Sequence, residues 1–429
     1  MATRNSATVK DVVLAPGSGS FFYDDQAAIR AGTPHDGFLY IGAPLTPGFT
    51  RIRMPARSLG IGLVLSDDVV VWGDMMSVQY SGAGGRDPVF QVETIEELTR
   101  SVVIPRLRSA DVSNFLVACN HVLAYHGGQR LPLAIEYGVS QALLRAAAHC
   151  ARTTLAEVIC SEFSLPLPER PIPIYAQSGD SREINVDKMI LKSVDVLPHG
   201  LINSREKFGP SGETFRKFVK WVAKRTREIG MPGYHPVLHF DVYGWIGLEI
   251  GMQPEKIVDF IARVADDVPG YRLHIECPAD FGSTEAQLNE YAKIVAFLDQ
   301  RGIEARIVVD EQCNTLDDIH LFANAKAAHI IQIKMPDVGS IADTARAVLI
   351  CKGNGVGSYV GGSCTETDLS ARAAVNIAVA TQADMILAKP GMGVDEGISI
   401  VGNEQSRLLS VLKYRRSQSS MRNVNAASK

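Results

Sequence analysis

The chain has 429 residues, of which 46% are hydrophobic and 21% are charged, and its formal net charge is −4. Single cores stop growing at roughly 250–300 residues, so this length predicts two domains, and the composition is that of an ordinary globular protein. The small net charge gives no broad basic field, which disfavours nucleic acid and membrane surfaces as partners.

The N-terminal segment MATRNSATVKDVVLAPGSGS contains no apolar stretch of signal-peptide length. Nowhere does an uncharged run approach the roughly 18 residues that a membrane span requires. The seven cysteines are scattered without CxxC spacing, which favours neither a disulfide framework nor a zinc site. We therefore expect a cytoplasmic protein with reduced thiols.

Residues 1–165 mix short β-type runs, such as Ile61–Leu65, with glycine-rich turns, and then change to helical patterns around Ala134–Ala148 and Thr154–Glu162. Such a mixture predicts an α+β domain. The SLPLPERPIP stretch that ends at Pro173 is dense in proline, which favours an extended linker over a helix. We place the domain boundary in this stretch.

Beyond the linker, eight short apolar runs recur, and segments of helical length separate most of them. Strands that alternate with helices predict parallel βα units, and eight units predict a TIM-type barrel over residues 166–413. The polar tail at 414–429 is predicted to be disordered. The eight runs are Ile174–Ala176, Met189–Leu191, Val237–Phe240, Leu273–Ile275, Arg306–Val309, Ile330–Ile333, Gly357–Val360 and Met385–Leu387.

A glycine-rich piece of the first domain, QYSGAGGRD from Gln79 to Asp87, lacks the spacing of a nucleotide-binding turn. One interpretation is a plain surface loop. The other is a lid loop that the first domain contributes to the mouth of the barrel, with Gln79 reaching the substrate. The sequence leaves both interpretations open.

Three acidic residues close three consecutive apolar runs: Asp241 in HFDVYG, Glu276 in LHIEC and Asp310 in IVVDEQ. Their separations of 35 and 34 residues match one βα repeat, which predicts equivalent places at the C-terminal mouth of three neighbouring strands. Carboxylates brought together repel one another unless a hard cation neutralises them, and oxygen ligands suit Mg²⁺. One such aspartate more often caps a helix or pairs with a lysine, but three in register favour a metal site.

The next run, HIIQIKMP, places Gln332 and Lys334 on the same face of a strand, pointing into the barrel. A buried lysine beside a metal cluster has a lowered pKa and can act as a base, although Lys334 can also be a counter-ion to Asp310. On the opposite side, His199 in VLPHG is either an acid or base or a structural residue. Such groups suit removal of a proton next to a carboxylate, with the metal stabilising the resulting dianion.

Ten segments follow one another along roughly residues 10–413: FFYDDQAAI, HDGFLY, QYSGAGGRDP, IYAQSGD, VLPHGLIN, HFDVYG, DEQCNT, QIKMPD, GGSCTET and LAKPGMGVDEG. Together they resemble methylaspartate ammonia-lyase, a family of the enolase superfamily. The resemblance implies a modified (β/α) barrel under an α+β capping domain, usually in a homodimer. It also implies conversion of 3-methylaspartate, or a related 3-substituted aspartate, to mesaconate and ammonia.

Transferred motif by motif, the resemblance implies that Asp241, Glu276 and Asp310 hold magnesium. It implies that Lys334 takes the C3 proton, and that His199 on the opposite face stabilises the transition state or acts on the other C3 epimer. A monovalent cation, commonly K⁺, is also implied. The implied substrate contacts are Gln177, Gln332, Ser363 and Cys364.

Five departures from the family pattern bear on substrate preference. They are Ser363 for the usual threonine, Tyr175 for phenylalanine, Cys277 for glycine, Gln312 for tryptophan, and a shorter loop after Pro336. Tyr175 is expected to add a hydroxyl to a pocket wall. One extra polar group can shift discrimination by one or two orders of magnitude, so the preferred C3 substituent stays open.

Two alternative functions also stay open. One is another lyase or dehydratase of the superfamily that releases water from a hydroxy acid. Many such enzymes carry Lys-x-Lys at the end of the second barrel strand, where this chain is expected to have Ile190-Leu-Lys192-Ser-Val194. The other is a catalytically silent binding protein with the same fold, but the metal ligands and the base are all present.

Overall fold

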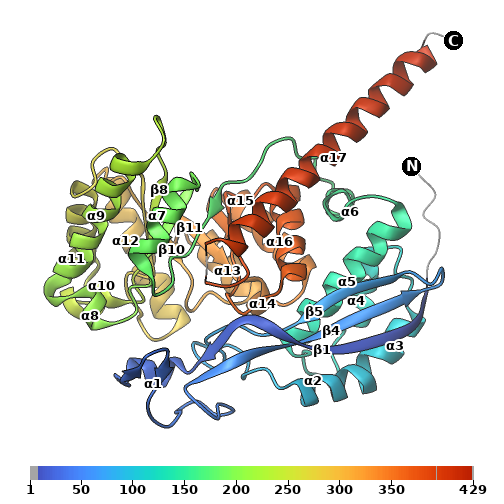
Figure 1. Ribbon diagram of the computed structural model, residues 1–429, viewed down its shortest axis with the longest axis horizontal. Helices are drawn as coiled ribbons and strands as arrows, with labels where there is room; N and C mark the ends of the chain where they lie inside the picture. The colour runs from blue at the N-terminus through green and yellow to red at the C-terminus, as the bar shows by residue number, and fades with distance from the viewer. Residues whose placement is uncertain (1–7, 393, 428–429) are drawn as a thin grey trace.

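The structure, a computed structural model, describes residues 8–392 and 394–427. Figure 1 shows a barrel at the left, an N-terminal sheet with its helices at the lower right, and the end of the last helix projecting away from both. No helix of the described part of the chain is long and apolar enough to span a membrane.

The N-terminal part is built on a three-stranded antiparallel sheet in the order β1–β4–β5. Its strands are β1 (Val9–Asp24), β4 (Arg53–Leu65) and β5 (Val70–Met75), and its main helices are α2 (Val92–Leu98), α3 (Ile104–Ser109), α4 (Phe115–Val122), α5 (Leu133–Ala151) and α6 (Leu155–Glu162). Helix α5 packs closely on β5: a Cβ on Gly73 would lie 2.0 Å from the carbonyl oxygen of Gly138. Glycine at this contact lets the helix approach the sheet.

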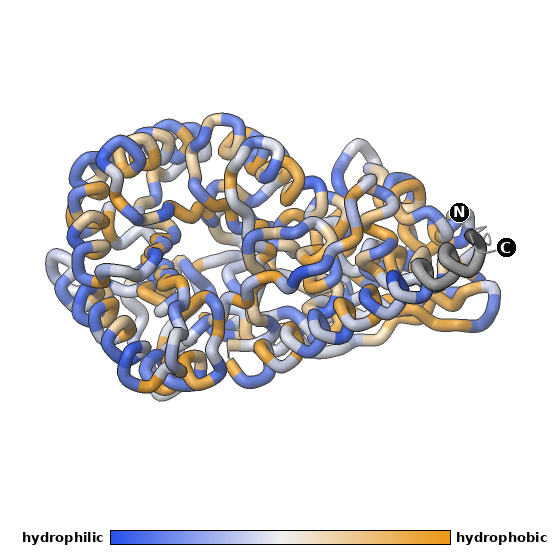
Figure 2. Tube along the Cα trace, turned by 90° about the horizontal axis from the view of Figure 1, so that it is seen from above, coloured by the Kyte–Doolittle hydropathy of each residue, from blue (hydrophilic) through white to orange (hydrophobic). Residues whose placement is uncertain are grey.

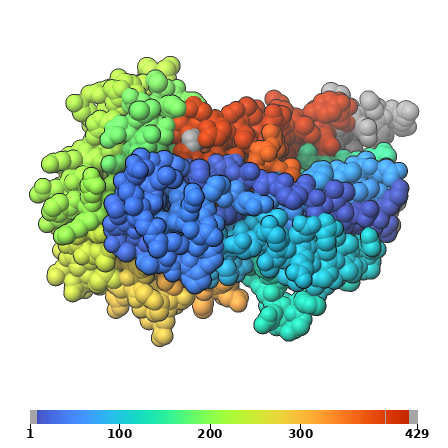
Figure 3. Space-filling model, turned by 60° about the horizontal axis from the view of Figure 1, so that its bottom comes forward, coloured from blue at the N-terminus to red at the C-terminus, as the bar shows by residue number. Residues whose placement is uncertain are grey.

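A short segment between β1 and β4 holds α1 (Gln26–Arg30), β2 (His35–Asp36) and β3 (Leu39–Tyr40). The buried carboxylate of Asp25 caps α1 by accepting from the N–H groups of Ala27 and Ala28. It also accepts from the backbone of Leu45 and Thr46, which fixes the far end of the segment. Figure 3 shows the N-terminal residues (blue) on the outer surface, between the green and yellow residues of the barrel and the cyan helices of the N-terminal part.

Eight parallel strands form the closed barrel that the sequence predicts. They are β6 (Ile174–Tyr175), β7 (Val196–His199), β8 (Val237–Asp241), β9 (Leu273–Glu276), β10 (Ala305–Val309), β11 (Ile330–Ile333), β12 (Gly357–Val360) and β13 (Met385–Leu387). Figure 2 shows the ring of chain that they and the outer helices make. The expected fold class, an α/β barrel with an N-terminal α+β part, is confirmed.

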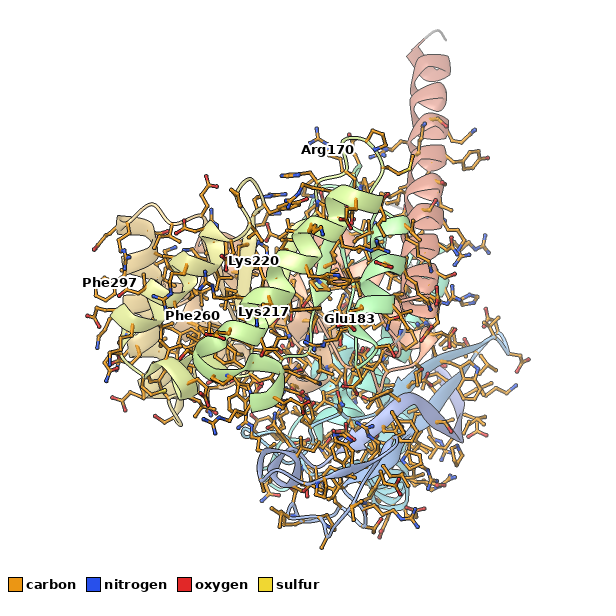
Figure 4. The ribbon with its side chains drawn as sticks, turned by 60° about the vertical axis from the view of Figure 1, so that its left-hand side comes forward. Arg170, Glu183, Lys217, Lys220, Phe260 and Phe297 are labelled. Carbon is orange, nitrogen blue, oxygen red and sulfur yellow. The ribbon has the colours of Figure 1, made fainter. Side chains whose placement is uncertain are left out.

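The helices between and after these strands pack around the barrel. They are α7 (Arg182–Leu191), α8 (Arg205–Phe208), α9 (Glu213–Ile229), α10 (Trp245–Ile250), α11 (Pro254–Asp266), α12 (Thr284–Gln300), α13 (Leu316–Asn324), α14 (Met335–Val338), α15 (Ile341–Gly353), α16 (Asp368–Thr381) and α17 (Glu396–Ala427). Figure 4 shows Lys217 and Lys220 on α9 and Phe260 on α11, and only Phe260 is buried. This separation of polar and apolar sides is the pattern of helices packed around a barrel.

The sequence prediction is wrong at the second barrel strand. Met189–Leu191 is the end of α7, where Met189 and Ile190 are buried, and the strand is Val196–His199. A short apolar run does not distinguish a strand from the buried side of a helix. The true strand contains Pro198, a residue that is depleted in strands.

The last helix enters the tail at 414–429, whose disorder stays a prediction. Helix α17 continues to Ala427, and residues 428–429 lie outside the described part. No proline or glycine interrupts the sequence after Gly402, and Leu408 and Leu412 bury the inner side of the helix. Polar composition alone does not stop a helix that lacks breaking residues.

Candidate active site

Three buried carboxylates lie at the C-terminal ends of neighbouring barrel strands. Asp241 ends β8, Glu276 ends β9, and Asp310 directly follows β10. Asp241 and Glu276 are partners across the β8–β9 ladder. The three residues therefore lie at the strand ends that their spacing in the sequence predicts.

These carboxylates lie in a strongly acidic environment. Burial, followed by the charges of Glu276 and Glu311, raises the pKa of Asp241 well above its ordinary value. Burial and the charges of Asp310 and Glu311 raise the pKa of Glu276 in the same way. A cation bound between these two adjacent carboxyl groups would favour their ionised forms.

Glu276 is held from three directions. Its Oε2 accepts a hydrogen bond from His239 Nε2 at 2.6 Å, and its Oε1 accepts one from Gln332 Nε2 at 2.7 Å. The Tyr359 hydroxyl donates to the same carboxylate at 3.0 Å. Burial lowers the pKa of His239 to about 3, so its ring is neutral and Nε2 can donate.

Lys334 follows β11, and its Nζ donates to Asp310 Oδ2 at 2.7 Å. Burial is the largest influence on the Lys334 pKa and lowers it, but Asp310, Asp337 and Glu311 together raise this pKa above its ordinary value. Paired with Asp310, Lys334 keeps a raised pKa, and the lowering that the sequence predicts beside a metal cluster stays a prediction. Lys334 therefore pairs with Asp310, which is the counter-ion interpretation that the sequence left open.

Burial also opposes ionisation of Asp310, but the charges of Lys334 and Arg86 outweigh it and hold the Asp310 pKa below its ordinary value. Arg86 comes from the glycine-rich loop of the N-terminal part and is itself buried. Its Nε donates to Asp337 Oδ2 at 2.7 Å, and its Nη2 lies 3.5 Å from Asp310 Oδ1. Arg86 thus joins the glycine-rich loop to the acidic end of the barrel.

His199 is the last residue of β7 and lies across the site from Lys334. Its Nε2 is 3.4 Å from Asp241 Oδ2, and its Nδ1 accepts from the backbone N–H of Leu201. Burial lowers the pKa of His199 to about 3, so the ring is neutral at ordinary pH. A neutral imidazole in this place can exchange a proton or form a hydrogen bond with a ligand.

The glycine-rich loop reaches the barrel mouth, as the lid interpretation predicts. The backbone N–H of Gln79 donates to Ser363 Oγ at 2.9 Å, and Cys364 Sγ donates to Gln79 Oε1 at 3.2 Å. Gln79 Nε2 donates to Asp24 Oδ2 at the end of β1. The loop after β12 and the N-terminal part therefore meet at Gln79.

One pocket contains the residues that sequence reasoning selected. All of them line it except Glu276, which lies behind Gln332 and Tyr359. The lining members of that set are Gln79, Gln177, His199, Asp241, Asp310, Gln332, Lys334, Ser363 and Cys364. The pocket thus brings together groups from the barrel strands and from the N-terminal part.

Sequence reasoning missed further lining residues: Tyr80, Arg86, Tyr243, Glu311, Tyr359 and Leu387. Alternation along β12 and β13 could have indicated the inward direction of Tyr359 and Leu387. Glu311 adjoins a chosen aspartate, and Arg86 lies inside a quoted motif. No sequence signal distinguishes these two from surface charges.

The acidic residues at the strand ends fit the predicted magnesium ion by their chemistry rather than by their present spacing. Among the residues that the structure describes, no group of three or more His, Cys, Asp or Glu side chains stands close enough together to hold an ion. Glu276 and Asp310 instead contact Gln332 and Lys334. The residues nevertheless fit by chemistry, because buried oxygen donors end three adjacent strands and two of the carboxyl groups have raised pKa values.

Three departures from the family pattern, at Cys277, Gln312 and Tyr175, have clear structural settings. Cys277 and Gln312 have φ angles of 46° and 64°, in the left-handed region that favours glycine. Tyr175 does not line the pocket, so the expected hydroxyl on a pocket wall is wrong. Its ring is fully buried inside the barrel and stacks on His239 with centroids 4.3 Å apart.

A closed parallel barrel with an α+β part beside it is a fold shared with solved enzymes of low sequence identity. Muconate lactonizing enzyme from Pseudomonas fluorescens superposes with a TM-score of 0.59 over 87% of this chain and 85% of that chain. At 16% identity this likeness shows the fold alone.

Closer comparisons define the family. The models for the N-terminus and the C-terminus of methylaspartate ammonia-lyase match residues 7–164 and 166–414. Methylaspartate ammonia-lyase 2 of Carboxydothermus hydrogenoformans is 44% identical over 94% of this chain and 98% of its own length. The magnesium complex of β-methylaspartase from Clostridium tetanomorphum has 42% identity and a TM-score of 0.90, covering 95% of this chain and 100% of that chain. The chain belongs to the methylaspartate ammonia-lyase family.

Proposed function

We propose that this enzyme is a carbon–nitrogen lyase that eliminates ammonia from 3-methylaspartate, or a related 3-substituted aspartate, to give mesaconate or the corresponding fumarate. The observation that carries the proposal is a pair of pocket groups without hydrogen-bond partners among the described residues: Gln332 Oε1 and Arg86 Nη2. One accepts and the other donates, which suits the ammonium and carboxylate groups of an amino acid.

Asp241, Glu276 and Asp310 would hold Mg²⁺, which when bound supplies charge stabilisation for the substrate carboxylate as negative charge develops on it. The raised pKa values of Asp241 and Glu276 support this assignment, since a cation would favour their ionised forms. Lys334 must be an uncharged amine to accept the C3 proton. Its contact with Asp310 opposes that form, so Asp310 has to turn to another partner before the proton is transferred.

His199 serves the opposite face of the substrate. Its neutral ring can donate a hydrogen bond to the charge that forms there, or accept a proton from the other C3 epimer. Gln177, Gln332, Ser363 and Cys364 orient the substrate, and Gln79 closes the pocket from the capping side. We assign residues 1–165 to the capping domain and 166–413 to the catalytic barrel.

The proposal extends to the setting of the enzyme. It includes K⁺ as a monovalent cofactor, a homodimer, and a cytoplasmic location without nucleic-acid or membrane partners. All seven cysteines are free thiols, which is consistent with a reducing compartment.

The competing dehydratase function has less support. With the second strand placed at Val196–His199, that strand ends in Val-Leu-Pro-His, which contains no Lys-x-Lys. A panel of 3-substituted aspartates and 2-hydroxy acids, with magnesium and potassium, separates the possibilities by ultraviolet absorbance of the unsaturated product. Magnesium-dependent product and ammonia from 3-methylaspartate support the proposal, and turnover of hydroxy acids alone contradicts it. Binding without turnover of any compound would indicate the silent binding protein.

A further inference from the structure

A buried ion pair that the proposed chemistry does not use lies beside the pocket. Lys389 follows β13, and Glu366 lies in the loop after β12; both side chains have 0% exposure. Lys389 Nζ donates to Glu366 Oε1 at 3.0 Å and to the carbonyl oxygen of Gly361 at 2.7 Å. The pair therefore holds the start of the loop that carries Ser363 and Cys364.

Glu366 connects this loop to the capping domain. Its Oε1 also accepts from the backbone N–H of Ser363 at 2.9 Å. Its Oε2 accepts from the Tyr137 hydroxyl at 2.6 Å, and Tyr137 belongs to α5. One carboxylate thus joins a barrel lysine, the backbone of a substrate-contact residue and a helix of the cap.

The loop backbone rests directly on this pair. A Cβ on Gly362 would lie 2.0 Å from Glu366 Oε1 and 2.3 Å from Lys389 Nζ. Only glycine permits this approach, so the position of the loop is set by the two charged groups beneath it.

A buried ion pair of this kind contributes little to the stability of the fold. Removing two charges from water is costly, and apolar replacements of buried pairs are often neutral or stabilising. What the pair provides is a fixed geometry, because both Glu366 oxygens have partners that lie on different elements. Groups that contact substrate need this kind of support to act at fixed distances.

We propose that Lys389 and Glu366, together with Tyr137, are positioning residues that fix the Ser363–Cys364 backbone and make substrate affinity depend on the seating of the cap. The inference rests on the proposed function only in taking Ser363 and Cys364 as substrate contacts. It assigns no contact with substrate to Lys389, Glu366 or Tyr137.

Two variants test the proposal. Tyr137→Phe removes only the hydroxyl that the cap donates to Glu366. The double variant Lys389→Met with Glu366→Gln removes both charges at nearly constant volume, and melting temperatures establish that each variant is folded. We expect each variant to raise the KM for 3-methylaspartate roughly tenfold, the scale of one buried hydrogen bond, with kcat changed less than about twofold.

A second readout does not need turnover. Cys364 is buried, so its alkylation by a small thiol reagent, resolved by mass spectrometry, reports loosening of the loop. We expect the double variant to alkylate Cys364 about tenfold faster than the wild type, with Cys351 of α15 unchanged as the control. Wild-type KM together with wild-type protection of Cys364 in folded variants would overturn the inference. A wild-type enzyme inactive on every aspartate would refute the proposed function, while the alkylation rates would still decide the positioning role.

Discussion

Replacing Tyr175 by phenylalanine should stabilise the protein. The Tyr175 side chain is fully buried, and its hydroxyl has no hydrogen-bond partner among the described residues. An unpaired buried hydroxyl lowers the free energy of unfolding by about 1–3 kcal/mol, so removing it stabilises the protein. The van der Waals contacts that the oxygen makes are lost at the same time, which reduces this gain. Phenylalanine keeps the stacking on His239, so we expect a net gain of about 1 kcal/mol.

Urea unfolding of the metal-free protein measures this gain as a shift in midpoint at constant slope. Tyr359→Phe is the matched control, because the Tyr359 hydroxyl donates to Glu276 at 3.0 Å. We expect this second change to destabilise the protein by about 1–2 kcal/mol. A loss of stability in Tyr175→Phe, or shifts of the same sign in both variants, would refute the reasoning.

Three further predictions follow from the contacts. Asp25→Ala should cost about 2–4 kcal/mol in urea unfolding, since four backbone N–H groups and the Thr46 hydroxyl lose an acceptor. The hydrogen bonds hold the Asp25 pKa below 3.8 despite the opposing effect of burial, so its contribution is present above pH 3.8 and is lost as the pH falls through the folded-state pKa. Arg86→Gln should lower the free energy of unfolding in urea by about 3 kcal/mol or more, because the buried Asp337 carboxylate loses its partner. Adding Asp337→Asn should restore much of this stability, and a double variant no more stable than Arg86→Gln would contradict the pairing. His199→Gln should lower kcat but leave the kcat/KM profile between about pH 5 and 8 unchanged in shape, because the His199 pKa is about 3. A wild-type acid limb in that range that the variant loses would contradict this prediction.

The sequence was most informative where chemistry and periodicity coincide. Asp241, Glu276 and Asp310 could be placed because a βα repeat has a nearly constant length and strand ends share one mouth. The strand at Val196–His199 could not, because Pro198 weakens its pattern and the neighbouring helix presents a stronger apolar run.

Contacts between the two parts of the molecule were the least predictable. Arg86 and Tyr137 reach Asp337 and Glu366 across more than 200 residues of sequence, and no local pattern encodes such pairs. The Lys334 pKa shows the same limit. The direction in which the Lys334 pKa shifts depends on the charges that surround the lysine in the folded chain, and composition and spacing do not reveal these charges.

The central claim is that Lys334 removes the C3 proton at a magnesium site. The most direct test follows 3-methylaspartate by proton NMR in deuterated, magnesium-containing buffer, with wild-type enzyme and with Lys334→Ala, while calorimetry measures magnesium binding by both. The account predicts mesaconate and ammonia from the wild type, and a loss of at least about 10²-fold in C3–H exchange and product from a variant that still binds magnesium. Exchange or elimination by Lys334→Ala at the wild-type rate would contradict it.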